Sequence, residues 1–412
     1  MKILIINTVD SKSGAARAAN RLHKSLQKTD IDSNMLVYYK LTKENSIISA
    51  KNPKLNLIRK IFGYYERYLK RKYKIPNKLS FSISVTPDEI LKYINRINPD
   101  VVHFHWFNKG FMKLETLKKI KQPIVWTLHD MWAFTGGCHY NQNCEKYKTE
   151  CGACPVLTSN KEDDLSKMVF RRKHKIYPQL PNFNIVTPSK WLGGCAKESV
   201  LLRNVNVEVI PNCIDTNVFK PIDKKQARNN WNLPENKKLI LFGALKTNSD
   251  PRKGFQHLSK ALNELKKENS ALLIFGSEEP ETSIDYGLET HFVGRINDDD
   301  KLAHLYSAAD VMVVPSVQEN LGNAIMESLA CSTPVVAFNI GGNSDMIDHE
   351  VNGYLAKPFN VQDLAKGIDW IIEDDHRWKA LSEEAHKKVM KHYTQENIAN
   401  KHLELYRKIL QN

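Results

Sequence analysis

Short apolar runs alternate with polar loops and amphipathic segments along most of the chain. The runs begin at Lys2, Val101, Pro123, Asn184, Lys238, Ala271, Val311 and Val335. After Lys2–Asn7, for example, Ala18, Leu22 and Leu26 recur at helical spacing. Continuous apolar runs are typical of strands that are buried on both faces of a parallel sheet. Strand, loop and helix in repeated order predict an α/β fold built from doubly wound units.

The stretch from Val311 to Phe338 combines this pattern with two carboxylates. It predicts a strand at Val311–Val314, a turn, a helix at Asn323–Ala330 and a second strand. Ligands of open α/β sheets bind outside the carboxyl ends of the strands, and a helix N-terminus there suits a phosphate. Glu319 in the turn and Glu327 in the helix could accept hydrogen bonds from sugar hydroxyls. The alternative is that Glu319 caps the helix and Glu327 lies on a solvated face.

At these residues the sequence resembles the GT-B glycosyltransferases of the retaining family GT4. That family has two glutamates separated by seven residues, a Leu-Gly turn and a Thr-Pro-Val-Val-Ala-like strand, found here as Glu319, Leu321-Gly322, Glu327 and Thr333–Ala337. The resemblance implies two Rossmann-like domains that face a cleft, with a C-terminal helix returning to the first domain. The expected domains are 1–216 for the acceptor, 217–392 for the nucleotide-sugar and 393–412 for the returning helix.

The resemblance also implies roles for residues of the second domain. Glu327 would hold the ribose, Glu319 the donor sugar, and the N–H groups of Asn320, Leu321 and Gly322 the sugar or the distal phosphate. Arg295 and Ile296 would line the pocket of the nucleobase.

Basic side chains are expected beside the diphosphate of the donor. The family places an arginine after the glycine of the first strand and a lysine before the glycine that opens the next helix. Lys253 fits the second role, whereas Ala244 occupies the first, and Arg252 could supply the missing charge. Two cations can stabilise a leaving diphosphate without a metal. The alternative for both residues is a solvated, charged loop.

Polar residues after the strands of the first domain are candidates for the acceptor side. The family has strand-end histidines at the positions of His105 and His129, and the second lies beside the transferred sugar. We therefore expect His129 to be catalytic and His105 and Asp130 to line the acceptor side. Ser13 and Gly14, after the first strand, would touch acceptor and donor. The loop lacks the full GxGxxG fingerprint, so NAD and FAD are not expected.

Four cysteines follow His129 closely. The spacing is C-x5-C-x6-C-x2-C, formed by Cys138, Cys144, Cys151 and Cys154. Four thiols within 17 residues of a cytoplasmic chain favour a structural zinc site, in which His139 could replace one ligand. Free thiols and disulfides are the alternatives. No cofactor is expected to be required for catalysis.

Composition and charge narrow the choice of partners. The chain has 412 residues, 42% hydrophobic and 26% charged, and a net charge of +14. These values predict a soluble protein of two or three domains with an anionic partner. Neither a run of about 20 apolar residues nor a signal-peptide pattern is found, so we expect a cytoplasmic protein. No nucleic-acid recognition motif stands out, and nucleic acid is not an expected partner.

The segment 51–78 is the most basic part of the chain. Its apolar residues recur at helical spacing: Ile58, Ile61, Phe62, Tyr65, Leu69 and Tyr73. Basic residues occupy another face, as in helices that bind an anionic membrane surface. The alternative is a surface helix whose apolar stripe packs on its own domain.

Together these features predict a retaining, metal-independent glycosyltransferase (EC 2.4) at the inner face of the cell membrane. The donor would be a UDP- or GDP-sugar, and the acceptor a lipid-linked or polysaccharide chain of the cell envelope, such as capsule or lipopolysaccharide. The alternatives are a nucleotide-sugar epimerase of GT-B fold and a non-catalytic basic binding protein.

Overall fold

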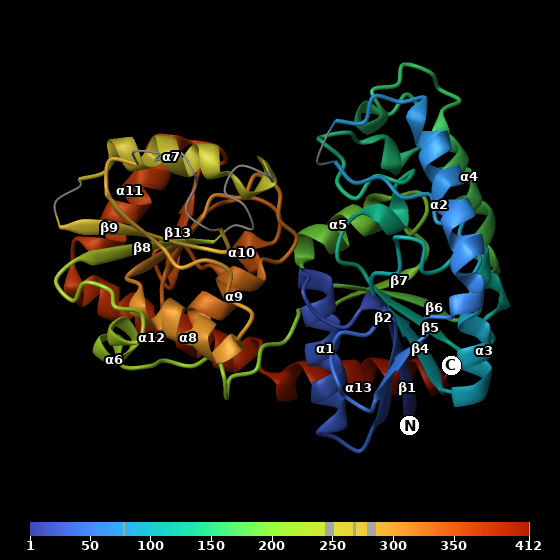
Figure 1. Cartoon of the computed structure of the whole chain (residues 1–412), viewed down its shortest axis with the longest axis horizontal. Helices are drawn as coiled ribbons and strands as arrows, with labels where there is room; N and C mark the ends of the chain where they lie inside the picture. The colour runs from blue at the N-terminus through green and yellow to red at the C-terminus, as the bar shows by residue number, and fades with distance from the viewer. Residues whose placement is uncertain (77–78, 244–250, 267–268, 278–285, 412) are drawn as a thin grey trace. The chain divides into compact units, whose positions relative to one another are not determined.

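The chain forms two compact units (Figure 1). The first unit comprises Met1–Asn212 and Ile398–Asn412, and the second comprises Cys213–Asn397. The structure, a computed structural model, describes residues 1–76, 79–243, 251–266, 269–277 and 286–411. Each unit is described by itself below.

The first unit is built on a seven-stranded sheet in the order β3-β2-β1-β4-β5-β6-β7, in which all neighbours are parallel. Its strands are β1 (Lys2–Val9), β2 (Asp32–Tyr39), β3 (Ile47–Ser49), β4 (Val101–Phe104), β5 (Ile124–Thr127), β6 (Phe183–Thr187) and β7 (Asn206–Val209). Its helices are α1 (Gly14–Gln27), α2 (Asn56–Arg71), α3 (Ile90–Ile97), α4 (Leu165–Ile176), α5 (Lys190–Glu198) and, from the end of the chain, α13 (Gln395–Gln411).

The second unit has a six-stranded parallel sheet in the order β10-β9-β8-β11-β12-β13. Its strands are β8 (Lys238–Gly243), β9 (Ser270–Phe275), β10 (Glu289–Phe292), β11 (Val311–Val314), β12 (Val335–Phe338) and β13 (Gly353–Ala356). Its helices are α6 (Lys224–Asn229), α7 (Phe255–Glu264), α8 (Asp299–Ala308), α9 (Asn323–Ala330), α10 (Asn343–Met346), α11 (Val361–Ile372) and α12 (Asp375–His392).

Short 3₁₀ helices lie in the connections of both units. They cover Pro53–Leu55, Leu114–Lys119, Trp132–Phe134, Lys146–Lys148, Pro155–Leu157, Tyr177–Gln179 and Pro251–Lys253. None of the helices in the described ranges is long and apolar enough to cross a membrane.

Both sheets contain the strand order 3-2-1-4-5-6 of the doubly wound fold when the strands of each unit are counted from its own first strand, and the first sheet adds β7 after it. The order reverses between β1 and β4 in the first unit and between β8 and β11 in the second. Ligands of such sheets bind at the carboxyl ends of the strands beside this reversal. The predicted fold of two Rossmann-like domains is confirmed.

The apolar runs of the second sheet are continuous because the sheet is covered on both faces. Leu241, Met312 and Val314 face one hydrophobic core, whereas Phe242 and Val313 face another. Alternate residues of a strand point to opposite faces, so both sets must be apolar.

Helix α13 packs on the first unit, although it follows the second unit in the chain (Figure 1). The hydroxyl of Tyr406, which is fully buried, lies 2.6 Å from Nδ1 of His103 in β4. Asn182 Nδ2 donates to the carbonyl oxygen of Ile409 at 2.8 Å. The predicted return of the C-terminal helix is therefore confirmed.

Candidate functional site

The loop after β11 packs tightly on the loop before α7. Gly254, at the N-cap of α7, has φ +70°, and a Cβ built on it would lie 1.7 Å from the carbonyl oxygen of Pro315. Val317 N donates to Arg252 O at 2.8 Å. A side chain at residue 254 would push these loops apart, so glycine is required there. The contact places Lys253 beside the turn that carries Glu319.

Glu319 and Lys253 form an ion pair at the carboxyl end of β11. Lys253 Nζ lies 2.8 Å from Glu319 Oε2. The Lys253 side chain is 43% exposed and that of Glu319 is 13% exposed, so the pair lies at the surface of the second unit. The predicted phosphate ligand and the predicted sugar ligand are therefore neighbours.

A third loop holds the backbone of Glu319. Gly342 N donates to Glu319 O at 3.2 Å. Gly341 has φ +53°, and a Cβ on it would lie 1.9 Å from the same oxygen. Three loops thus meet at Glu319, and its position is fixed by backbone contacts as well as by Lys253.

Glu327 is buried in α9, with 4% of its surface exposed. Its Oε2 accepts a hydrogen bond from the hydroxyl of Tyr306 in α8 at 3.1 Å. Burial excludes the alternative that Glu327 lies on a solvated face. Its role as ribose ligand stays a prediction. Sequence reasoning missed Tyr306, for which the only signal was a tyrosine within a predicted helix.

Tyr306→Phe is expected to weaken nucleotide binding by about tenfold. Hydrogen bonds to charged groups contribute roughly 1.5–3 kcal/mol, and the loss leaves Glu327 less firmly oriented. The measurement is calorimetric titration with UDP and GDP. Tyr354→Phe is a matched control, because Tyr354 Oη donates to Asp363 at 2.9 Å in the same unit. Equal affinities of the two variants would contradict a role for Tyr306 at the site.

The remaining predicted donor-side residues differ in exposure. Asn320, Leu321 and Gly322 are buried at the start of α9, where Gly322 is the N-cap. Arg295 is exposed, and Ile296 is half-buried against the core of the second unit. Ala244 lies outside the described residues. The roles of these side chains stay predictions.

Two histidines meet at the ends of β4 and β5. His105 Nδ1 lies 2.8 Å from His129 Nε2, and the rings stack with centroids 5.1 Å apart. Burial lowers the pKa of His129 to about 4 and that of His105 well below its usual value. Both imidazoles are therefore neutral at pH 7, and one donates its N–H to the other. In the described ranges, His105 Nε2 is buried without a hydrogen-bond partner.

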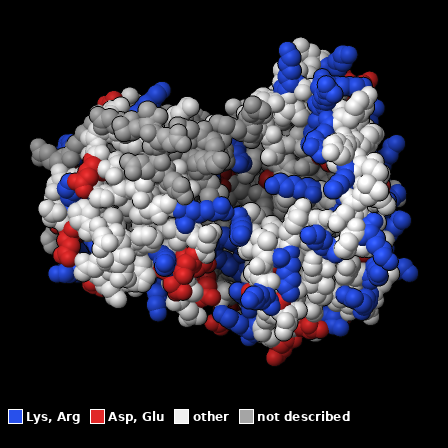
Figure 2. Space-filling view, in the orientation of Figure 1, with Lys and Arg blue, Asp and Glu red and all other residues white. Residues whose placement is uncertain are grey.

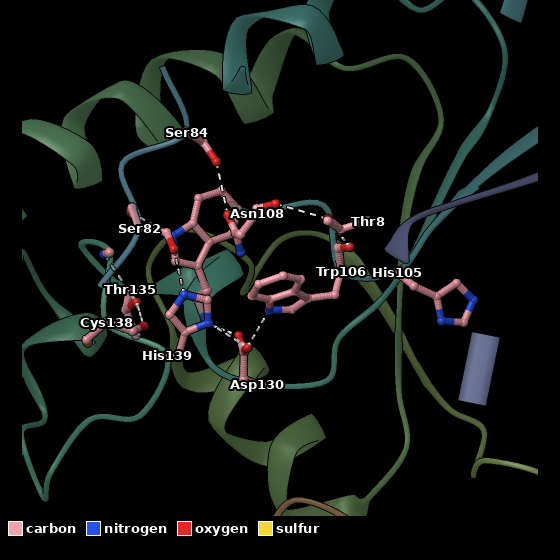
Figure 3. Close-up of polar contacts among 12 residues, drawn as sticks. Thr8, Ser82, Ser84, His105, Trp106, Asn108, Asp130, Thr135, Cys138 and His139 are labelled. Carbon is pink, nitrogen blue, oxygen red and sulfur yellow. Dashed lines mark hydrogen bonds and ion pairs between the residues drawn. The ribbon is translucent and has the colours of Figure 1, made fainter. Parts of the chain in front are cut away.

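Asp130 accepts three hydrogen bonds beside this pair (Figure 3). The donors are Trp106 Nε1 at 3.0 Å, Trp132 N at 2.8 Å and His139 Nδ1 at 2.6 Å. Burial alone would raise the pKa of Asp130, but His139 and these hydrogen bonds hold it below its usual value. Asp130 is thus an ionised centre that orients two aromatic side chains, of which Trp106 is partly exposed.

His139 joins this cluster and not the cysteines. Its Nε2 lies 2.9 Å from the hydroxyl of Ser82, so both ring nitrogens are engaged (Figure 3). Because both ring nitrogens of His139 bind Ser82 and Asp130, the expectation that His139 could replace a zinc ligand is wrong. Sequence reasoning missed Ser82 and the pairing of His139 with Asp130.

Ser13 ends the loop after β1 and Gly14 is the first residue of α1; both are exposed. Ser13 is the N-cap of α1, and its hydroxyl accepts from Ala16 N at 3.3 Å. Capping of the helix is sufficient to explain a serine at this position, so contact of Ser13 and Gly14 with donor or acceptor stays a prediction.

The four cysteines Cys138, Cys144, Cys151 and Cys154 are free thiols that line one cavity. As the side chains are placed, the described residues contain no group of three or more His, Cys, Asp or Glu that could hold a metal ion. The predicted zinc shell is therefore not formed by these rotamers, although its four ligands are brought together.

Comparison with known proteins agrees with this architecture. The family profile described as Glycosyltransferase Family 4 matches residues 13–218, and that described as Glycosyl transferases group 1 matches residues 223–388. An uncharacterized glycosyltransferase from Methanocaldococcus jannaschii is 29% identical over 325 residues, 75% of each chain.

Two solved structures share the fold. Sucrose-phosphate synthase from Thermosynechococcus elongatus has a TM-score of 0.72 at 20% identity, over 100% of this chain and 99% of that one. HepE from Anabaena, in complex with UDP-glucose, has a TM-score of 0.65 at 16% identity, over 99% and 100% of the two chains. The Family 4 profile alone spans half of the chain. The chain belongs to Glycosyltransferase Family 4, and the protein is a glycosyltransferase.

Proposed function

We propose that the protein transfers a sugar from a UDP- or GDP-sugar to a lipid-linked or polysaccharide acceptor during cell-envelope glycan synthesis. The anomeric configuration is retained, and no metal takes part in the reaction. The enzyme works at the inner face of the cell membrane, which it binds through α2. The exposed apolar and basic surface of this helix is the observation that carries the proposal.

The second unit supplies the donor side. Glu319 accepts hydrogen bonds from hydroxyls of the donor sugar, and Glu327 from those of the ribose. Lys253, with Arg252 next to it, stabilises the negative charge that builds up on the leaving diphosphate. The ion pair between Lys253 and Glu319 supports this assignment, because the proposed ligand of the diphosphate and the proposed ligand of the sugar lie together at the end of β11. The HepE complex with UDP-glucose, on a similar fold, supports a nucleotide-sugar donor.

The first unit supplies the acceptor side. His129 lies beside the transferred sugar as a neutral imidazole, oriented by His105. Asp130 and the partly exposed Trp106 offer a carboxylate and an aromatic face, both of which suit carbohydrate hydroxyls and ring C–H groups.

Helix α2 is unusual in burying none of its 16 residues. Five of its large apolar side chains are between 48% and 69% exposed: Leu57, Ile61, Tyr64, Tyr65 and Tyr68. We call these five residues the α2 surface. Part of the helix does pack on its own unit, because Leu69 contacts the cluster around Phe81 and Ile83. The α2 surface is the part that this packing leaves uncovered.

The positive charge around the α2 surface favours an anionic lipid surface over an uncharged apolar partner. Lys60, Arg67 and Arg71 are exposed on the same helix and Lys72 directly after it, and Figure 2 shows Lys and Arg side chains gathered on this part of the first unit. Each contributes on the order of 1 kcal/mol near an anionic leaflet. Aromatic and aliphatic side chains flanked by cations are typical of helices that lie in a membrane interface.

The double variant Ile61→Asp/Tyr64→Asp is expected to bind anionic vesicles at least about tenfold more weakly, because burying each large apolar side chain contributes roughly 1.5–3 kcal/mol. Sedimentation with phosphatidylcholine vesicles, with and without phosphatidylglycerol, measures this. Val351→Asp is a matched control, since Val351 is 50% exposed in the second unit. Unchanged binding of the double variant would refute docking through α2.

The same variants test the acceptor. Transfer of label from a UDP- or GDP-sugar into the lipid extract of membranes should fall in the double variant, while the affinity for free nucleotide stays the same. Label that is released without any acceptor, at the same rate in both proteins, would instead favour the epimerase alternative.

A further inference from the structure

The segment that follows β5 contains an enclosed group of sulfur atoms. Cys138, Cys151 and Cys154 are 7–8% exposed, and Cys144 is half-buried. All four line one cavity together with the backbone around Thr135 and Gly136. The 17 residues from Cys138 to Cys154 therefore bring four cysteines to the same cavity. The only regular structure in this segment is one short 3₁₀ helix, Lys146–Lys148.

A backbone N–H group points at one of these sulfurs. Gly136 N donates to Cys151 Sγ at 3.1 Å. Such donors stabilise negative charge on sulfur, as in metal-bound thiolates.

The backbone between Cys151 and Cys154 adopts the strained conformation of a tight loop. Ala153 has φ +41°, and a Cβ on Gly152 would lie 2.4 Å from Glu162 O. A non-glycine residue in the left-handed region costs of order 1 kcal/mol and persists where surrounding contacts enforce it.

A buried lysine lies beside the cavity. Lys173 of α4 is fully buried; Nζ donates to the carbonyl oxygens of Trp132 and Thr135, and lies 3.8 Å from the centre of the Trp132 ring. Thr135, whose carbonyl oxygen binds Lys173, also lines the cavity, so Lys173 lies close to the four cysteines.

We infer that Cys138, Cys144, Cys151 and Cys154 bind one structural zinc ion in the cavity that they line, with Lys173 as the buried countercharge. Binding releases four protons, and the resulting shell of Zn²⁺ and four thiolates has a net charge of −2, which the ammonium partly offsets. The thiols as placed do not yet form this shell. Metal binding therefore requires the cysteine side chains to rotate, and rotation about χ1 moves a sulfur by about 3 Å between staggered positions.

The zinc would act on the acceptor side without touching the substrate. Cys138 precedes His139, which binds Asp130, and Thr135 Oγ1 donates to Cys138 O at 2.6 Å (Figure 3). Met131 N donates to His139 O at 3.0 Å. The ion therefore fixes the segment that brings His139 to the end of β5, and it leaves no open coordination position for catalysis.

The test is the metal content of the full chain, purified without added metal and without chelator. We expect about one zinc ion per chain, since four thiolates complete a tetrahedral site. Cys144→Ser changes the most accessible ligand and should lower zinc retention against a chelator at least tenfold. Cys195→Ser is the matched control, because Cys195 is half-buried in α5 outside the segment, and it should retain zinc like the wild type.

Two further measurements keep the inference open to refutation even if a variant folds poorly. Replacement of the ion by Co²⁺ in the wild type should give the intense thiolate-to-metal absorption of a tetrahedral four-sulfur site. Lys173→Met leaves all four ligands in place and should weaken zinc binding. A metal-free wild type with seven reactive thiols, or disulfides among the four cysteines, would overturn the inference, whatever the transferase activity proves to be.

Discussion

Glu319→Ala is expected to reduce sugar transfer by about 100-fold, because hydrogen bonds to a charged group contribute roughly 1.5–3 kcal/mol. Three loops hold the residue in place, so its carboxylate is pre-positioned for the donor sugar. The measurement is kcat/KM with the nucleotide-sugar that the enzyme uses. The loss should appear mainly in kcat, since the sugar is where charge develops during transfer.

The affinity of Glu319→Ala for the free nucleoside diphosphate should increase. Lys253 is paired with Glu319 in this structure, and alanine at 319 releases its ammonium for the diphosphate. The gain is at most a few-fold, because partly exposed ion pairs contribute only about 0–1 kcal/mol. Glu350→Ala, an exposed carboxylate of the same unit, should change neither quantity. Strong loss of nucleotide affinity in Glu319→Ala would contradict the assignment of Glu319 to the sugar.

The first unit is expected to lose several kcal/mol of stability on acidification from pH 7.5 to pH 5. Five buried histidines, His23, His103, His105, His129 and His402, have their pKa values lowered by burial, those of His23, His129 and His402 to about 4. In the unfolded chain a histidine has a pKa near 6.5. Between about pH 6.5 and pH 4 the unfolded chain therefore binds more protons than the folded one, and stability falls as the pH falls.

The three histidines with a pKa of about 4 set the size of the effect. By pH 5, His23, His129 and His402 together remove about 6 kcal/mol from the free energy of unfolding, about 2 kcal/mol each. Urea unfolding at pH 7.5 and pH 5, followed by tryptophan fluorescence, measures the difference.

His402→Met isolates one contribution, because it removes a titrating group of similar volume from α13. The difference in unfolding free energy between the two pH values should shrink by about 2 kcal/mol. His376→Met, at an exposed position of α12, should leave the difference unchanged. An unaltered pH dependence in His402→Met would show that this histidine is not held neutral in the fold.

The fold could be predicted because its causes are local. Strands such as β11 and β12 are short, apolar on both faces and bounded by turn residues, so pattern alone locates them. The paired glutamates could be recognised for a similar reason, since their spacing lies within one loop and one helix. The strand order then follows from the preference for short, right-handed connections.

The partners of the site residues could not be predicted, because they join elements that are separate in sequence. Tyr306 and Glu327 are 21 residues apart, and His105 and His129 are 24 apart. Such contacts depend on how helices and strands pack, which no periodicity encodes. The exposure of the α2 surface was equally undetermined, because an amphipathic pattern does not say what covers the apolar face.

Helix α13 has a consequence for how the protein is made. Its Tyr406 meets His103 across 303 residues of sequence, and the intervening chain includes the whole second unit. On the ribosome, the second unit is contiguous and can close its sheet as soon as residue 397 has emerged. The first unit, although synthesised earlier, must wait for Ile398–Gln411 to cover β4. Folding of the nascent chain therefore ends where synthesis began, and until then the apolar side chains of β4 that α13 covers stay open.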